Sequence, residues 1–184
     1  MSSPSEIIVH CGLHKTGTTA IQQGIVNHFD PCMDAGIYLY NGNTKFAAHH
    51  GLAAQLSRYP AQSHEMLENL VQDIRTHNQP KTFISSEDFQ CILTSPDTMR
   101  MFIDALQRSG ADKVTFLIYL RNPIPYLTSM YITLLFFRHN VPFSDYFEAI
   151  MDTGYYRYRK WKLHFDYQEI AESLDAMNVD FAFR

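Results

Sequence analysis

The residues of this sequence best suited to chemistry lie in a glycine-bearing loop, GLHKTGTT, at positions 12–19. The loop follows a short apolar run, residues 7–11, which indicates a buried strand, and a helix is expected to begin near Gly17. In such a strand–loop–helix unit, backbone N–H groups and the positive end of the helix dipole converge on one anion. The segment therefore predicts a phosphate-binding loop.

The position of Lys15 indicates which kind of phosphate compound this loop binds. Loops for nucleoside triphosphates have the pattern G-x-x-x-x-G-K-[ST], in which lysine directly follows the second glycine. Gly12 and Gly17 keep that spacing, but Thr18 and Thr19 follow, and Lys15 stands inside the loop. From there its ammonium group could meet the oxygen that bridges a phosphate to a transferring group. A tight turn with incidental polar residues is the alternative interpretation.

A second polar pair follows another apolar run, residues 114–120, which predicts an interior strand. Arg121 comes directly after this run, where open α/β sheets bind ligands, and Ser129 stands on the helix expected next. A guanidinium and a hydroxyl group can hold one phosphate from two sides. A salt bridge for Arg121 and a helix-packing role for Ser129 are the alternatives.

Together the two motifs resemble those of the sulfotransferase superfamily, above all bacterial enzymes that use 3′-phosphoadenosine 5′-phosphosulfate. The likeness covers residues 7–184 and rests on GLHKTGTT, on YLRNP at positions 119–123 and on the serine that follows. The resemblance implies that the 5′ end of this donor is held by Lys15, Thr16, Gly17, Thr18 and Thr19. It also implies that Arg121 and Ser129 bind the 3′-phosphate. The expected product is 3′,5′-adenosine bisphosphate, and the expected acceptor is a hydroxyl group, or less often an amine, on a small molecule, lipid or glycan.

A catalytic base is expected at the same edge of the sheet, because sulfuryl transfer requires removal of the acceptor proton. Glu87 is the first candidate, since it follows the strand predicted at residues 81–85. His14, within the loop, is the second candidate. Lys15 is expected to stabilise charge on the leaving oxygen. The alternative for Glu87 is an acid favoured at a helix N-terminus, and the alternative for His14 is a histidine that only donates to the anion.

Two other functions remain open. A P-loop nucleotide kinase or NTPase would need Mg²⁺ ligands, which Ser86, Glu87 or Asp88 could supply, although the displaced Lys15 argues against it. The other is a catalytically inactive nucleotide-binding or interaction domain. The chain ends at Arg184, directly after a predicted strand, whereas the family usually continues into a helix and a loop that covers the nucleotide. Residues 1–184 are therefore expected to be a single sulfotransferase-like domain that is incomplete at its C-terminus.

The elements that position these residues alternate between strands and helices. This order predicts a P-loop NTPase-like α/β fold, a three-layer sandwich with a mostly parallel central sheet. Strands are predicted at residues 7–11, 36–40, 81–85, 114–120 and 179–183, and helices from 17, over 61–77, over 96–109, from 123 and from 167. The first helix is expected to pack through Ile21, Ile25 and Phe29. At the start of the last helix, Asp166 with Glu169 resembles a capping box.

Composition limits the class of protein. The chain has 184 residues, of which 46% are hydrophobic and 18% charged, as in one globular domain. Its net charge of −4 is not typical of a nucleic-acid binder, so none is expected as a partner. Arg121, Pro123 and Pro125 interrupt the most apolar stretch, which argues against a membrane span. The odd cysteine count and the absence of a signal-peptide pattern favour a cytoplasmic protein.

Three further patterns are less specific. His49 and His50 lack a third ligand at a recognisable spacing, so no metal is expected. Surface histidines are the favoured interpretation, and a role in a loop or an acceptor site is the alternative. The segment YYRYRKW, residues 155–161, could bind a sugar or an anionic acceptor, but a half-buried connector is the favoured interpretation. Helical spacing places a predicted core face at Tyr126, Met130, Leu134 and Phe137.

Overall fold

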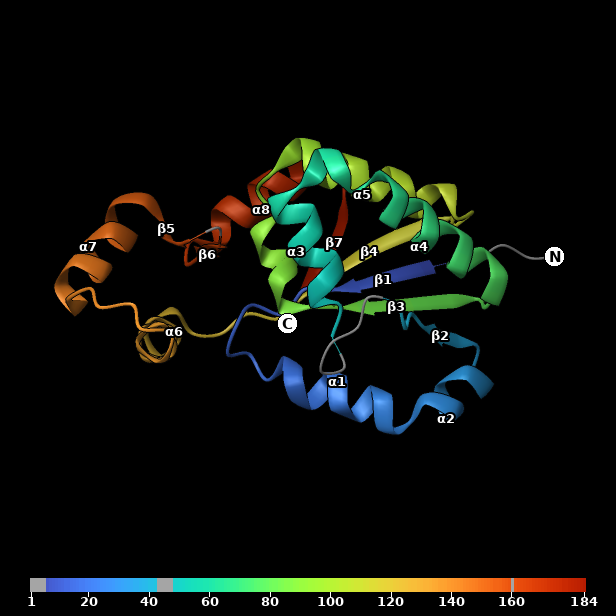
Figure 1. Cartoon of the computed structure of the whole chain (residues 1–184), viewed down its shortest axis with the longest axis horizontal. Helices are drawn as coiled ribbons and strands as arrows, with labels where there is room; N and C mark the ends of the chain where they lie inside the picture. Colours follow the sequence, from blue (N-terminus) through green and yellow to red (C-terminus); the bar gives the residue numbers. More distant parts are fainter. Residues whose placement is uncertain (1–5, 43–47, 160) are drawn as a thin grey trace.

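The computed structural model describes residues 6–42, 48–159 and 161–184, and its centre is a five-stranded parallel sheet (Figure 1). In spatial order the strands are β2 (Ile37–Leu39), β3 (Lys81–Ser85), β1 (Glu6–His10), β4 (Lys113–Ile118) and β7 (Asp180–Phe183). The sequence predicted all five within one or two residues at each end. The α/β fold is confirmed, and the described sheet is parallel throughout.

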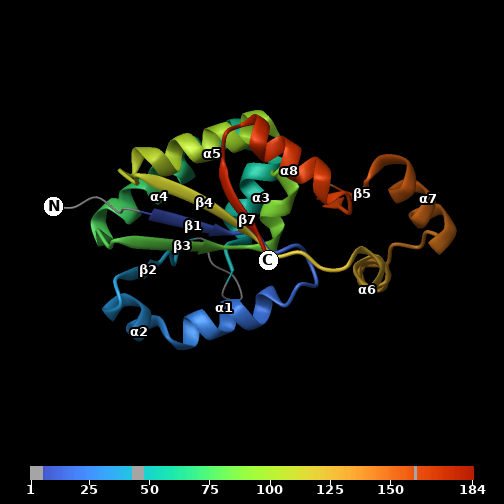
Figure 2. The ribbon, with the colours of Figure 1, turned by 180° about the vertical axis from the view of Figure 1, so that it is seen from behind.

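Helices cover both faces of the sheet and complete the three predicted layers (Figures 1 and 2). One face carries α3 (His50–Arg58), α4 (His64–His77), α5 (Pro96–Arg108) and α8 (Tyr167–Ala176). The opposite face carries α1 (Thr18–Asn27) and α2 (Phe29–Asp34). Two 3-10 turns, η1 (Pro60–Gln62) and η2 (Glu87–Cys91), connect elements on the first side.

The strands alternate between two unequal faces, because successive side chains of a strand point in opposite directions. Ile7, Val9, Ile84 and Phe116 are fully buried on one of these faces and belong to the main hydrophobic core. On the other face, Phe83 is only half-buried. The first face therefore supplies most of the apolar burial that holds the carboxyl ends of the strands in place.

Helix α1 does not pack in the way that its sequence suggested. The buried residues of α1 are Thr18 and Gln22, whereas Ile21 and Ile25 are only half-buried, and Phe29 begins α2. The predicted apolar face is therefore wrong. Polar contacts face the sheet instead. The Gln22 amide donates to Ser85, the last residue of β3, and to Glu87 just beyond it, and a buried amide is costly unless it is paired.

A smaller unit of α6 (Pro123–Phe136), α7 (Phe143–Thr153) and the antiparallel hairpin of β5 (Tyr155–Tyr158) and β6 (Trp161–His164) extends beyond the carboxyl ends of the sheet strands (Figure 1). The Tyr158 hydroxyl donates to the carbonyl of Phe137 at 3.0 Å and so joins the hairpin to the end of α6. Within the described ranges, no helix is long and apolar enough to cross a bilayer.

The start of α8 fulfils half of the predicted capping box. The Asp166 carboxylate accepts from the backbone N–H groups of Gln168 at 2.9 Å and Glu169 at 3.3 Å. The Glu169 carboxylate does not return to Asp166. It accepts from Lys162 at 2.8 Å and lies 3.2 Å from Nδ1 of His164, so a contact with β6 replaces the second half of the box.

Candidate functional site

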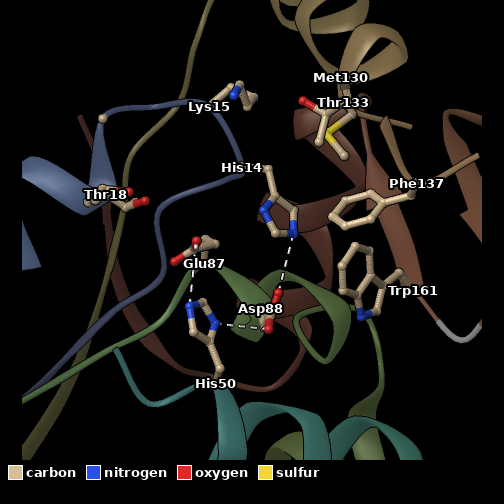
Figure 3. Close-up of a pocket in the computed structure, with 12 residues that line it drawn as sticks. His14, Lys15, Thr18, His50, Glu87, Asp88, Met130, Thr133, Phe137 and Trp161 are labelled. Carbon is tan, nitrogen blue, oxygen red and sulfur yellow. Dashed lines mark hydrogen bonds and ion pairs between the residues drawn. The ribbon is translucent and has the colours of Figure 1, made fainter. Parts of the chain in front are cut away.

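A cleft of about 740 Å³ opens at the carboxyl ends of β1 and β3 (Figure 3). One side is formed by the glycine loop (residues 12–17), by the start of α1, by His50 and by the carboxylates Glu87 and Asp88. We call this side the sheet wall. The opposite side, the aromatic wall, consists of Met130, Thr133, Phe137 and Trp161 from α6 and β6.

The glycine loop has a tight conformation that depends on both of its glycines. A Cβ atom on Gly12 would overlap the side chain of Thr18. Gly17 has a φ of 82° and serves as the N-cap residue of α1, and Lys15 has a φ of 66°. Left-handed backbone favours glycine, so the value at Lys15 marks a strained position at the crown of the loop.

Backbone contacts fix the loop to the sheet. The N–H of Leu13 donates to the carbonyl of Tyr119 at 3.1 Å, and the Thr16 hydroxyl donates to the carbonyl of Leu13 at 2.6 Å. The crown is held by Nη1 of Arg121, which donates to the carbonyl of Lys15 at 3.0 Å. Lys15 itself is exposed and, with Thr18 and the other residues at the start of α1, lines the cleft.

The Asp88 carboxylate is shared by two imidazoles in the sheet wall (Figure 3). Its Oδ1 lies 3.3 Å from Nε2 of His14, and its Oδ2 lies 2.9 Å from Nδ1 of His50. Burial opposes ionisation of Asp88, but its contacts with these two histidines outweigh burial and hold its pKa well below the usual range. Asp88 is therefore an anion that orients both rings.

Glu87 faces the same cleft and has different partners. It accepts a hydrogen bond from Nε2 of Gln22 at 3.1 Å, and its Oε1 lies 3.9 Å from Nε2 of His50. The Gln22 amide also donates to the Ser85 hydroxyl at 3.2 Å. His50 thus lies between two carboxylates, with one ring nitrogen toward each.

Beneath these groups, buried histidines support the ends of β1 and β3. Nδ1 of His10 lies 2.8 Å from the Ser85 hydroxyl, and burial lowers the pKa of His10 to about 4, an effect that the nearby Glu87 only partly offsets. His49 accepts from the backbone N–H of Ser85 at 2.9 Å, and its Nε2 lies 2.6 Å from the carbonyl of Tyr40. Burial lowers the pKa of His49 as well. Both rings are therefore neutral structural groups at pH 7.

The aromatic wall meets the sheet wall at the Trp161 ring, whose centroid lies 5.6 Å from that of His14. Trp161 packs edge-on against Phe137 at 5.9 Å. Tyr126, Met130 and Leu134 are buried as predicted, but 47% of the Phe137 surface is exposed. Placing Phe137 in the core was thus wrong, because α6 ends there and its ring turns to the cleft.

The proposed 3′-phosphate ligands lie apart from the described lining of this cleft. Arg121 is tied to the glycine loop, and its own carbonyl accepts from the Tyr167 hydroxyl at 2.7 Å. Ser129 is half-buried on α6, where its carbonyl accepts from Thr133 at 3.0 Å. The structure therefore brings the Arg121 guanidinium to the backbone of the loop, and none of the hydrogen bonds in the described part of the chain joins Arg121 to Ser129.

Several residues of the site were not chosen as functional residues from the sequence, although His50 and Trp161 belong to segments for which a binding role was an alternative interpretation. His50 and Trp161 line the cleft, and Gln22 holds Glu87. The prediction of a surface histidine is wrong for His49, which is buried, whereas His50 is half-buried and faces the cleft. Helical periodicity gave no signal for Gln22, because the face predicted to pack was Ile21, Ile25 and Phe29. The position of Trp161 depends on the hairpin, and no local pattern predicts it.

Within the described part of the chain, no group of three or more His, Cys, Asp or Glu side chains is arranged to hold a metal ion. The glycine loop, the helix start and the imidazole–carboxylate cluster are the features that an anionic ligand would meet in the cleft. Comparison of the chain with protein-family models and with curated proteins finds no match.

Proposed function

We propose that this protein is a sulfotransferase that moves a sulfuryl group from 3′-phosphoadenosine 5′-phosphosulfate to a hydroxyl acceptor. One observation carries the proposal. The glycine loop, with Lys15 at its crown, shares one cleft with a cluster of two imidazoles and two carboxylates. The first group suits binding of a donor anion, and the second suits removal of a proton.

The start of α1 is well suited to the 5′ end of the donor. Thr18 and Thr19 begin a ten-residue helix, and Gly17 leaves the approach to its N-terminus free of a side chain. The helix dipole and the backbone N–H groups of this first turn attract a bound anion. Arginine has five N–H donors, so the contact of Arg121 with the loop leaves its guanidinium able to bind the 3′-phosphate as well.

Lys15 is the residue that we assign to the leaving group. During transfer, the bond between sulfur and the 5′-phosphate oxygen breaks while the acceptor oxygen bonds to sulfur. An ammonium group at the loop crown stabilises the negative charge that develops on that phosphate oxygen. Such stabilisation needs a fixed cation, and the backbone of Lys15 is held by Arg121.

For the base, the geometry favours His14 over Glu87. A His14 tautomer that carries its proton on Nε2 directs it to Asp88, 3.3 Å away, and keeps the lone pair on Nδ1 for the acceptor proton. Glu87 is already engaged by Gln22 and lies near His50. In this assignment Glu87 positions neighbouring side chains, and Asp88 orients the base.

Calorimetry tests the proposal directly. The protein is titrated with 3′,5′-adenosine bisphosphate without metal and, in parallel, with ATP and Mg²⁺. Tighter binding of the bisphosphate is expected, and a preference for ATP with Mg²⁺ would instead support the nucleotide kinase or NTPase. Radiolabelled donor incubated with a mixed pool of hydroxyl compounds then reports transfer itself, and binding without transfer would support the inactive domain.

The role of Arg121 is tested with the same method. Arg121→Ala should weaken binding of the bisphosphate while binding of 5′-AMP is largely retained, because only the bisphosphate carries the 3′-phosphate. Equal losses for both nucleotides would show that Arg121 acts only through its contact with the loop. Ser129→Ala serves as the companion variant, and a loss confined to the bisphosphate would place Ser129 at the same phosphate.

A further inference from the structure

A second cavity, of about 400 Å³, adjoins the proposed transfer site. Phe137 and Trp161 line both cavities, so the two spaces meet at these rings. The remaining lining consists of Tyr158, Arg58 and Arg159. A ligand that enters the cleft between its two walls can therefore extend past Trp161 into this second space.

The aromatic side of the second cavity is held in place by neighbouring contacts. Tyr158 is 7% exposed and donates its hydroxyl proton to the carbonyl of Phe137 at 3.0 Å. The Phe137 and Tyr158 rings stack at 6.3 Å, and the Tyr158 and Trp161 centroids lie 6.1 Å apart. Fixed aromatic faces are suited to flat rings and to the apolar faces of sugars.

The charged side of the cavity is positive. Arg58 ends α3 and Arg159 lies in the turn of the hairpin, and both are exposed. Neither has an ion-pair partner within residues 6–42, 48–159 and 161–184, and the described lining contains no carboxylate. Lys162 on the same hairpin differs, since it is paired with Glu169 at 2.8 Å. Two arginines without acidic partners beside one cavity attract an anion.

We infer that this cavity is an acceptor subsite for molecules that carry an anionic group next to a ring, such as an acidic sugar. The inference rests on the proposed function, because it treats the adjoining cleft as the place of transfer. The acceptor hydroxyl lies by His14, a ring packs against Trp161 and Phe137, and the anionic group binds Arg58 and Arg159. Part of the segment at residues 155–161, which the sequence favoured as a connector, thereby takes a binding role.

Binding of two matched glycosides tests the subsite without any need for turnover. The probes are 4-nitrophenyl β-D-glucuronide and 4-nitrophenyl β-D-glucoside, which differ by one carboxylate, and each is titrated into the full chain by calorimetry. The glucuronide is expected to bind about tenfold more tightly, as a charge-assisted contact allows. The double variant Arg58→Gln/Arg159→Gln should remove this preference.

Arg157→Gln is the matched control. Arg157 packs over the Tyr155 ring at 5.2 Å, as Arg159 packs over the Tyr158 ring at 5.2 Å, but Arg157 lies outside the described lining of the cavity. This control should keep the preference for the glucuronide. Equal affinity for the two glycosides, including no measurable binding of either, would overturn the inference, as would a preference that survives in the double variant.

Parallel titration with 3′,5′-adenosine bisphosphate separates the two proposals. If the bisphosphate fails to bind while the arginine-dependent preference holds, the sulfotransferase assignment is lost and the anionic subsite stands. If the bisphosphate binds and the preference is absent, the sulfotransferase assignment stands and the subsite is lost. The double variant should bind the bisphosphate as the wild type does, which also shows that it is folded.

Discussion

The two walls of the cleft are built on different physical principles. In the sheet wall, directional contacts link the side chains of His14, His50, Glu87, Asp88 and Gln22. These side chains lie at the carboxyl ends of the parallel strands. The aromatic wall consists of rings that touch across α6 and the hairpin. Directional contacts fix atoms for chemistry, whereas ring packing supplies contact area that tolerates varied ligands. We therefore expect damage to the sheet wall to lower turnover, and damage to the aromatic wall to alter acceptor binding.

The largest effect is expected from Lys15→Ala, which should lower kcat for sulfuryl transfer by about a thousandfold, the upper range for loss of one stabilising group. Because Lys15 is exposed, the free energy of unfolding should change by less than about 0.5 kcal/mol. Transfer of radiolabelled sulfate measures the first quantity and urea denaturation the second. Lys113→Ala removes an exposed charge that pairs with Asp180, far from the cleft lining, and should leave kcat unchanged.

The second prediction concerns the buried base of the sheet wall. Since the pKa of His10 is lowered to about 4 in the fold, protonation below pH 6.5 favours the unfolded chain, and stability is lost as the pH falls from 6.5 to 4. This shift corresponds to about 3 kcal/mol. His10→Gln should reduce the loss of unfolding free energy over this range by about that amount, as measured by urea denaturation. His64→Gln, on an exposed position of α4, should behave as the wild type.

The third prediction separates the two candidate bases. His14→Gln should lower kcat by about a hundredfold, the usual loss on removal of a general base. Glu87→Gln keeps an oxygen that can accept from Gln22 and should cost less than His14→Gln. The reverse order of effects would assign the base to Glu87 and make His14 an anion-binding residue.

The smallest effect is expected at the aromatic wall. Trp161→Ala should weaken binding of both 4-nitrophenyl glycosides by about tenfold, because it removes the ring that lines both cavities. Binding of 3′,5′-adenosine bisphosphate should stay unchanged, since we assign this ligand to Lys15 and the start of α1, whereas the loop residue that the Trp161 ring approaches is His14. Phe143→Ala removes an exposed ring on α7 and is the control. A loss of bisphosphate binding in Trp161→Ala would contradict the division between the walls.

Much of the fold could be predicted from local sequence. Strand β3 begins and ends at the predicted residues, and α5 begins at Pro96 as expected. Buried parallel strands are continuous apolar runs, and proline marks the first turn of a helix, so both signals are local. The prediction failed for α1, where a polar residue, Gln22, faces the sheet. Its partners Ser85 and Glu87 belong to another strand end, which helical periodicity cannot reveal.

The sequence by itself determined the five strands of the sheet and the glycine loop with Lys15 at its centre, because glycine spacing and apolar runs act over a few neighbouring residues. It also placed His14, Glu87 and Asp88 after buried strands. It did not predict α2, α3, α7 or the hairpin of β5 and β6. Only the tertiary structure decided that His14 and His50 share Asp88 and that Trp161 closes the cleft. Such contacts join segments distant in the chain. The imidazole–carboxylate cluster forms only when packing of the parallel strands brings their carboxyl ends to one edge, and Trp161 reaches the cleft through the separate hairpin of β5 and β6.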